Sequence, residues 1–135
     1  MQQSARLDTQ YVENPQTLGE HLKNKQFELK ISQNEMARRM STNPENIISW
    51  CHSRTKPPIS FYPKIIDFLE YNPFQVDDKS IGGQIKKHRM EHGLSHRKLS
   101  KVTGFDPATL ARWEDNITSP NVEHKMKLVI MGIVK

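Results

Sequence analysis

The stretch GLSHRKLSKVTGFDPATLARWE, residues 93–114, decides the fold. Ser95 has the side chain of a helix N-cap, and Asp106 followed by Pro107 reads as a second N-cap with proline at the first helical position. Leu110 and Trp113 are spaced i, i+3, so both are expected to face inward and anchor the second of these helices. The stretch therefore predicts two short helices joined by a tight turn, which is the helix-turn-helix unit.

The same pattern occurs twice along the chain. A shift of 63 positions aligns Thr17–Pro58 with Ser80–Asn121 without a gap. Identical pairs include Gly19 with Gly82 and Trp50 with Trp113, and apolar character is kept at most helical core positions. A single offset that survives through helices and turns alike indicates an internal repeat. We interpret the two stretches as two copies of one small fold.

The apolar spacing within each copy is helical. It predicts a first helix near 17–29 and 80–92, with Gly93 as a C-cap, and a second helix that begins after Ser32 or Ser95. Glu35 is expected to complete a capping box with Ser32. A third helix follows Asn43-Pro44 or Asp106-Pro107. The last helices, near 61–70 and 122–133, are expected to be amphipathic through Ile65, Ile66, Phe68 and Leu69 in the first copy and Met126, Val129 and Ile130 in the second.

No segment alternates as a strand would, so the predicted fold class is all-α. We expect two tandem helical bundles of four to five helices each. The expected organisation is a polar arm over residues 1–16, a helix-turn-helix domain over 17–70, a linker over 71–79 and a second helix-turn-helix domain over 80–135.

Composition narrows the classes of function. The 135 residues carry a net charge of +5, which permits a polyanionic partner. Residues 17–74 hold 8 basic and 6 acidic side chains, whereas residues 80–135 hold 10 and 5, so the second copy has the stronger positive field. No run approaches the ~18 apolar residues of a membrane span, and no signal peptide is recognised. With Cys51 as the one cysteine, a reducing compartment is the simplest setting, and we expect a cytoplasmic, nucleoid-associated protein.

Residues 93–114 resemble the lambda-repressor-like, Xre-type DNA-binding family, and residues 31–50 resemble it more loosely. The two resemblances together cover about residues 17–133. They imply a compact bundle of four or five helices whose third helix reads DNA. The first copy departs from the family pattern because Cys51 and His52 replace the acidic pair Glu114-Asp115, and Ser41 replaces the turn glycine. These departures put its recognition role in doubt and leave packing or dimerisation as its alternative roles.

The face of the third helix opposite the tryptophan is the expected reading face, since the amino-terminal residues of such a helix reach base edges. Arg112 suits bidentate pairing with guanine and Asn46 with adenine, while the alternatives are a plain surface arginine and a residue that supports the helix cap. The base-reading candidates are Glu45, Asn46, Ser49, Ala108, Thr109 and Arg112. The phosphate-contact candidates, at the start of the second helix and after the third, are Gln33, Ser53, Arg54, Lys56, His96, Arg97, Asn116 and Thr118.

Other chemistry has little support in the sequence. His88, His92 and His96 recur every four residues, but Gly93 interrupts the helical face, so we expect no metal site. Cys51 is expected to be a partly buried small residue rather than a redox switch. No nucleophile–base constellation or glycine-rich phosphate loop is present, so we expect no enzyme and no cofactor.

The sequence thus predicts a transcription regulator that binds double-stranded DNA sequence-specifically through two unlike helix-turn-helix units. One alternative is a protein-interaction module, antitoxin-like or polymerase-binding, in which only the second unit binds DNA. Another is a DNA-binding accessory subunit of a mobile-element or restriction system. The expected partners are duplex DNA, a second copy of the chain in a homodimer, and RNA polymerase or another protein.

Overall fold

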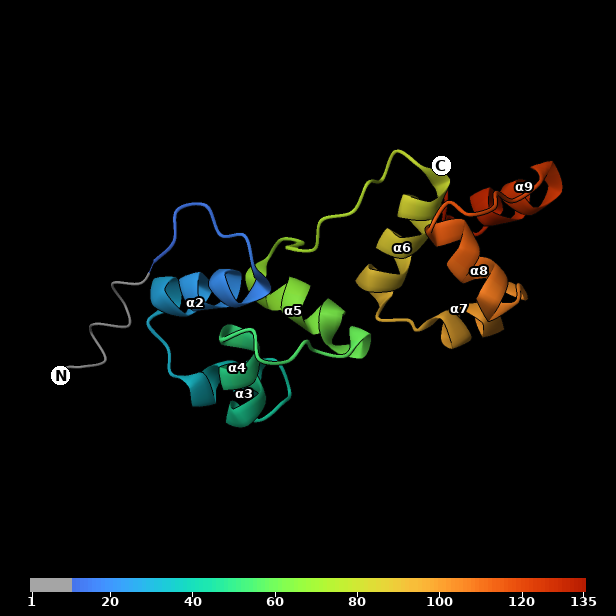
Figure 1. Cartoon of the computed structure of the whole chain (residues 1–135). Helices are drawn as coiled ribbons and strands as arrows, with labels where there is room; N and C mark the ends of the chain where they lie inside the picture. The colour runs from blue at the N-terminus through green and yellow to red at the C-terminus, as the bar shows by residue number, and fades with distance from the viewer. Residues whose placement is uncertain (1–10) are drawn as a thin grey trace. The chain divides into compact units, whose positions relative to one another are not determined.

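A computed structural model describes residues 11–135, and residues 1–10 of the expected arm lie outside the described part (Figure 1). The chain divides into two compact units, one up to Pro73 and one from Phe74. Unit 1 consists of α2 (Leu18–Leu29), α3 (Gln33–Arg39), α4 (Pro44–Cys51), the short 3-10 helix η1 (Ile59–Phe61) and α5 (Tyr62–Leu69). Unit 2 consists of α6 (Ile81–His92), α7 (His96–Thr103), α8 (Pro107–Glu114) and α9 (Val122–Ile130). Residues 11–135 contain no strand, which confirms the all-α prediction.

Side-chain caps fix where the helices begin. The hydroxyls of Ser32 and Ser95 accept hydrogen bonds from the third residue of α3 and of α7, as predicted. Pro44 and Pro107 occupy the first position of α4 and α8, where the missing N–H costs nothing. The residues whose side chains cap a helix in this way are Thr17, Ser32, Asn43, Ser80, Ser95, Asp106 and Asn121.

The predicted capping box at Glu35 is wrong. Its backbone N–H bonds to the Ser32 hydroxyl, but its carboxylate turns away and pairs with Arg38 and Arg39. The reciprocal arrangement occurs instead at the start of α2, where Thr17 and Glu20 bond to each other's backbone. Arginines at i+3 and i+4 attract the Glu35 carboxylate more strongly than a neutral amide does.

A residue with a left-handed backbone conformation, that is, with positive φ, follows each of the first three helices in both units. Lys30 follows α2 and Gly93 follows α6, and both have positive φ. The turn between α3 and α4 holds Ser41 at φ 57°, and the turn between α7 and α8 holds Gly104 at φ 84°. Ser53 and Asn116 have φ values of 58° and 59° after α4 and α8. Each pair is separated by the offset found in the sequence, so unit 1 adopts with serine the turn that unit 2 makes with glycine, at a cost of about 1–2 kcal/mol.

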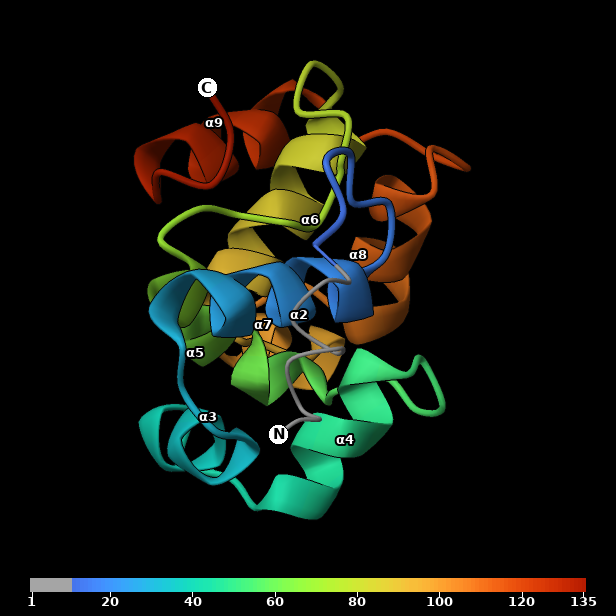
Figure 2. The ribbon, with the colours of Figure 1, turned by 90° about the vertical axis from the view of Figure 1, so that its left-hand side faces the viewer.

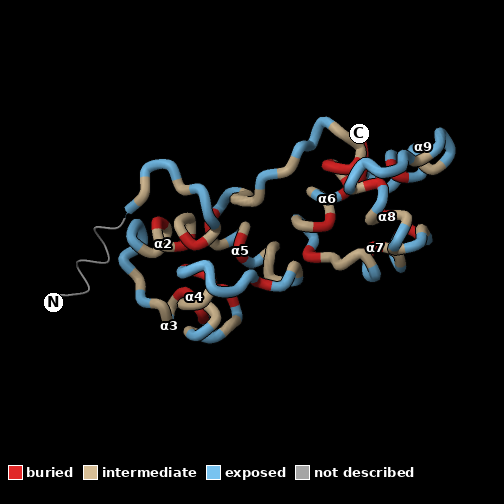
Figure 3. The backbone as a smooth tube through the Cα atoms, viewed as in Figure 1, coloured by how far each residue is buried: buried red, intermediate tan, exposed pale blue. Residues whose placement is uncertain are grey.

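The core of unit 1 lies between α2, α3, α4 and α5. In both views α3 and α4 lie on one side of α2 (Figures 1 and 2). Trp50 is 3% exposed and its ring meets the edge of Phe61, at a centroid separation of 5.3 Å. The tube view shows the buried positions on the inner sides of these helices (Figure 3). The fully buried side chains of the unit are Leu22, Met36, Met40, Ile47 and Ile65, with Leu69 1% exposed.

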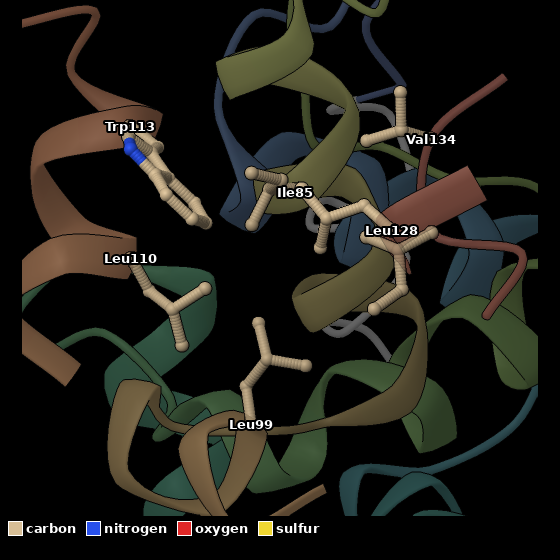
Figure 4. Packing of buried hydrophobic residues seen from close by; sticks show 7 residues of the cluster. Ile85, Leu99, Leu110, Trp113, Leu128 and Val134 are labelled. Atoms are coloured by element: carbon tan, nitrogen blue, oxygen red, sulfur yellow. The ribbon is translucent and has the colours of Figure 1, made fainter. Parts of the chain in front are cut away.

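The core of unit 2 gathers one side chain or more from each of its four helices (Figure 4). Trp113 is 4% exposed and packs edge-on against Phe105. Both tryptophans are therefore core residues, as the spacing predicted. The cluster comprises Ile85, Leu99, Leu110, Trp113, Leu128, Ile133 and Val134.

The predicted inner face of the last helix in unit 2 is wrong. Met126, Val129 and Ile130 are exposed, and Leu128 is the residue of α9 that is buried. The chain turns back at Gly132, which has φ 77°, and this turn buries Ile133 and Val134. These two residues supply the apolar contacts that the expected face of the helix would have made.

Two glycines allow close approach of helices. A Cβ on Gly82 would lie 2.3 Å from the carbonyl oxygen of Trp113, and a Cβ on Gly19 would lie 2.2 Å from that of Cys51. The first helix of each unit therefore packs directly on the carboxyl end of α4 or α8, which explains why glycine occurs at both positions.

The described end of the expected arm is attached to α2. The buried amide of Asn24 donates to the carbonyl of Val12 at 2.6 Å and accepts from its N–H at 2.8 Å. The ring of Tyr11 contacts that of Phe27. These contacts continue unit 1 in the amino-terminal direction beyond the first helix.

Candidate nucleic-acid interface

A buried ion pair fixes the carboxyl end of α8. Nε of Arg89 lies 2.5 Å from Oε2 of Glu114, and Nη2 lies 2.9 Å from Oε1, which is a bidentate arrangement. The third nitrogen of Arg89 donates to the carbonyl of Leu94 at 3.0 Å. The side chains of Arg89 and Glu114 are only 10% and 4% exposed. This pair ties α6, the turn before α7 and α8 together.

The outward face of α8 is open. Leu110 and Trp113 hold the inner face, and Ala108 and Arg112 are exposed on the outer one, with Thr109 half-buried. The Asp106 carboxylate caps the helix by accepting from the N–H groups of Ala108 and Thr109. Within residues 11–135 the Arg112 guanidinium makes no hydrogen bond or ion pair, so its donors are available to a ligand.

The neighbouring helix α7 is basic. Arg97, Lys98 and Lys101 are exposed, and the helix contains no acidic residue. Ser95 occupies the N–H of Lys98, while the N–H groups of the residues before it have no partner within the helix. Because the amino end of a helix attracts anions, this end of α7 suits a phosphate group.

His96 has a different environment from the one expected. It is half-buried, and its Nε2 lies 3.1 Å from Oε2 of Glu114. The imidazole is therefore directed toward the core side of α7, and the backbone N–H at this position is the group that faces the helix end.

The corresponding face of unit 1 is occupied by its own hydrogen bonds. Nδ2 of Asn46 donates to the Thr42 hydroxyl at 2.7 Å, and the hydroxyls of Ser49 and Thr55 share a hydrogen bond of 2.7 Å. Glu45 is exposed at the amino end of α4. These internal hydrogen bonds take up part of the hydrogen-bonding capacity of the polar side chains of α4.

Charge on α3 is also neutralised in part by an internal carboxylate. Glu35 lies between Arg38 and Arg39, and hydrogen bonds from both guanidinium groups lower the pKa of Glu35 from 4.5 to about 2. The basic residues of α3 are thus paired, whereas those of α7 are not. Unit 2 presents more unpaired positive charge beside its third helix than unit 1 does.

Unit 1 replaces the buried ion pair with neutral residues. Gln26 stands at the position of Arg89, and its amide donates to the carbonyl of Ile31 at 3.1 Å, as Arg89 does to Leu94. Cys51 stands at the position of Glu114 and is 5% exposed. Burial raises the pKa of the Cys51 thiol to about 11, so this residue is a poor nucleophile and a poor redox switch.

The comparisons with known proteins agree with this geometry. Residues 85–129 match the family model described as helix-turn-helix. The matched segment begins in α6, contains the whole of α7 and α8 and ends in α9, and the family binds DNA and regulates transcription. No curated protein and no solved structure matches the chain. Among the helices that the structure describes, none has the length and apolarity to cross a membrane.

The histidines of α6 form a pair rather than a metal site. The rings of His88 and His92 stack with centroids 4.1 Å apart, and Nδ1 of His92 bonds to the carbonyl of His88. Burial lowers the pKa of His88, and the neighbouring His92 lowers it further. His96 points elsewhere, and residues 11–135 contain no group of three or more side chains suited to hold a metal ion.

The structure places the sequence-predicted residues in two classes. The exposed ones are Glu45, Ser53, Arg54, Lys56, Arg97, Ala108, Arg112, Asn116 and Thr118, and the half-buried ones are Gln33, Asn46, Ser49, His96 and Thr109. Sequence reasoning missed Lys98 and Lys101 as part of the basic surface, although their helical spacing was visible. It also missed the partnership of Arg89 with Glu114, because nothing in a single sequence links residues 25 positions apart.

Proposed function

We propose that the chain is a transcription regulator that binds duplex DNA sequence-specifically, with α8 as its base-reading helix in the major groove. The open outer face of α8 is the observation that carries this proposal. Arg112 has free donors that fit O6 and N7 of guanine, and Ala108 and Thr109 offer methyl groups that suit contact with thymine. The exposed cations of α7 lie on the helix that precedes α8 in the chain.

Phosphate contacts would fix the position of α8 on the DNA without specifying sequence. The amino end of α7, with Arg97 and the backbone N–H groups at His96, would hold one phosphate. Asn116 and Thr118 are exposed in the turn after α8 and would hold another. In unit 1 the corresponding groups are Gln33 at the start of α3 and Ser53, Arg54 and Lys56 after α4.

We further propose that units 1 and 2 are two copies of one fold, with domains over 17–70 and 80–135 and a linker between them. The first three helices begin at positions separated by the same offset, and so do their left-handed turns. The close glycines, Gly19 and Gly82, meet the same part of the third helix. Two different reading faces then predict a DNA site with two dissimilar halves, with centres about 34 Å apart if both units dock on one side of the duplex.

Unit 1 has a second candidate role, as a protein-interaction module beside a single DNA-reading unit. The internal hydrogen bonds of Asn46 and Ser49 and the exposed Glu45 favour this role, because they leave α4 less ready to contact bases and phosphates. Duplex DNA is the partner in both cases. A polymerase subunit or a toxin is the kind of protein partner that the second role would involve.

DNA affinity measured against salt concentration tests the proposal and separates the two roles. Two engaged units should contact about 6–10 phosphates and lose ~10³–10⁵ in affinity between 50 and 200 mM salt. One engaged unit should give about half of that slope on a logarithmic scale. No salt-dependent binding to any duplex would refute the proposal.

The base-reading role of Arg112 has its own test. Arg112→Ala should cost about 1–3 kcal/mol on the preferred site and relax preference at one base pair. Lys125→Ala is the matched control, because it removes one exposed cation of α9, outside α7 and α8. Equal weakening by Arg112→Ala on all sequences would make this residue a phosphate contact instead.

A further inference from the structure

Unit 1 has a pocket lined by residues of α2, α3 and α5, and none of these residues belongs to α4. Helices α2 and α5 lie side by side in this unit (Figure 1). The pocket has a volume of about 320 Å³, at the lower end of the range of about 300–1,000 Å³ that is usual for ligand sites. The exposed Leu29 and the half-buried Phe68 give it an apolar lining. The pocket is therefore large enough for one small molecule with an apolar body.

The rest of the lining is charged, and cations outnumber carboxylates in it. The cations are Lys25, Arg39 and Lys64, and the carboxylates are Asp67 and Glu70. The lining therefore carries a net positive charge at neutral pH. A concave surface with a net positive charge attracts small anions.

Internal ion pairs neutralise only part of this charge. Nζ of Lys25 lies 3.4 Å from Oε2 of Glu70, so these two charges offset each other. Arg39 donates through Nε to Glu35, but this carboxylate is shared with Arg38. The terminal nitrogens of Arg39 make no hydrogen bond within residues 11–135, so they are available to a ligand.

Lys64 is the lining cation with the least internal compensation. It is exposed, and its Nζ lies 5.4 Å from the centre of the Phe61 ring. Lys64 pairs with no carboxylate in the part of the chain that the structure describes. Asp67, one turn further along α5, has no partner there either. Its carboxylate disfavours a ligand with more than one negative charge, because like charges repel.

Unit 2 has different residues at the corresponding positions. With the shift of 63 positions, His88 stands at the place of Lys25 and Val102 at the place of Arg39. The combination of an apolar lining with several cations is therefore a property of unit 1. It is the unit in which the polar side chains of α4 already have partners.

We infer that this pocket binds a small organic monoanion, a carboxylate on an aromatic or branched apolar body. The apolar body would lie against Leu29 and Phe68. The carboxylate would face Lys64 and Arg39, which are charge-assisted hydrogen-bond donors. An amine in the same place would be repelled by these two cations, and a neutral amide would lose their attraction. Binding at this pocket does not depend on contact with DNA, so it is tested on the free protein.

Titration of the full chain with phenylacetate, followed through the NMR shifts of backbone amides, tests the inference. Phenylacetamide is the neutral probe of the same shape, and phenethylamine is the cationic one. Phenylacetate should give saturable shifts at the carboxyl ends of α2 and α3 and along α5, with a dissociation constant of about 1 mM because the pocket is small and open. Phenylacetamide should bind about threefold more weakly, and phenethylamine more weakly still.

Three variants test the assigned contacts. Lys64→Gln should remove most of the preference for phenylacetate over phenylacetamide. Leu29→Glu places a carboxylate in the apolar lining and should weaken phenylacetate binding by about tenfold or more. Lys125→Gln is the matched control, because it makes the same change at an exposed cation of α9, and it should leave the binding of both probes unchanged.

The circular dichroism spectrum of each variant should match that of the parent, because all three substituted side chains are exposed. Absence of saturable shifts at the pocket, equal binding of the three probes, or equal effects of Lys64→Gln and Lys125→Gln would each overturn the inference.

Discussion

Unit 1 has Gln26 and Cys51 at the positions of Arg89 and Glu114. Placing glutamine and cysteine at these two positions of unit 2 tests whether the buried ion pair fixes the carboxyl end of α8. Arg89→Gln leaves the Glu114 carboxylate, whose side chain is 4% exposed, without its bidentate partner. Loss of one member of a buried ion pair costs about 3–5 kcal/mol. Glutamine can still donate to the carbonyl of Leu94, as Gln26 does to Ile31, so most of the loss comes from the unpaired charge.

Glu114→Cys leaves the buried Arg89 guanidinium without its partner and should lower the free energy of unfolding by a similar amount. We expect a value toward the lower end of this range because the long arginine side chain can reach water. The double variant Arg89→Gln/Glu114→Cys leaves no buried charge. It should therefore be more stable than either single variant, and the remaining cost is the smaller volume of cysteine, about 1–2 kcal/mol. The coupling between the two sites should be at least 2 kcal/mol.

Hydrogen exchange of the backbone amides in α6, α7 and α8 is the suitable assay, because it reports the opening free energy of unit 2 separately from unit 1. Lys87→Gln is the control, since its ion pair with Asp78 is exposed and should contribute less than about 1 kcal/mol. Additive effects of Arg89→Gln and Glu114→Cys, or single effects as small as that of the control, would refute the reasoning.

Three other predictions concern local features of the two units. Gly82→Ala should destabilise unit 2 by about 3 kcal/mol in thermal unfolding, because its Cβ would meet the Trp113 carbonyl at 2.3 Å, whereas Gly104→Ala, with φ 84° and open space, should cost only about 1 kcal/mol. Cys51, with a pKa of about 11, should react with a thiol reagent at pH 8 about 200-fold more slowly than free cysteine, and equal rates would contradict its burial. Glu35, whose pKa is lowered to about 2, should titrate near that value by NMR. Its stabilising contribution should be present above about pH 4.5 and disappear as the pH falls toward 2, and Arg38→Ala should move the midpoint upward.

The sequence predicted the features that depend on local order. Cap residues such as Ser95 and Asp106 bond to N–H groups three positions away or fewer, so their partners are visible in the chain. The inward direction of Trp50 and Trp113 follows from helical spacing with an apolar neighbour. The starts of the first three helices in each unit were predicted for these reasons.

Features that depend on competition or on distant contacts could not be predicted in this way. Glu35 had the spacing of a capping residue, but two nearby arginines compete for its carboxylate. The face that α9 buries is decided by the turn at Gly132, which returns Ile133 and Val134 to the core. Asn46 has the chemistry of a base-reading residue, but its amide donates to the Thr42 hydroxyl within unit 1, a contact that the sequence did not predict.

Selection of bound duplexes from a random pool tests the central claim most directly, with the parent chain and Arg112→Ala processed in parallel. The account predicts an enriched motif for the parent chain that contains at least one fixed guanine, and loss of preference at that position in the variant. Enrichment of no motif, or of the same motif with unchanged preference by both proteins, would contradict base reading by α8.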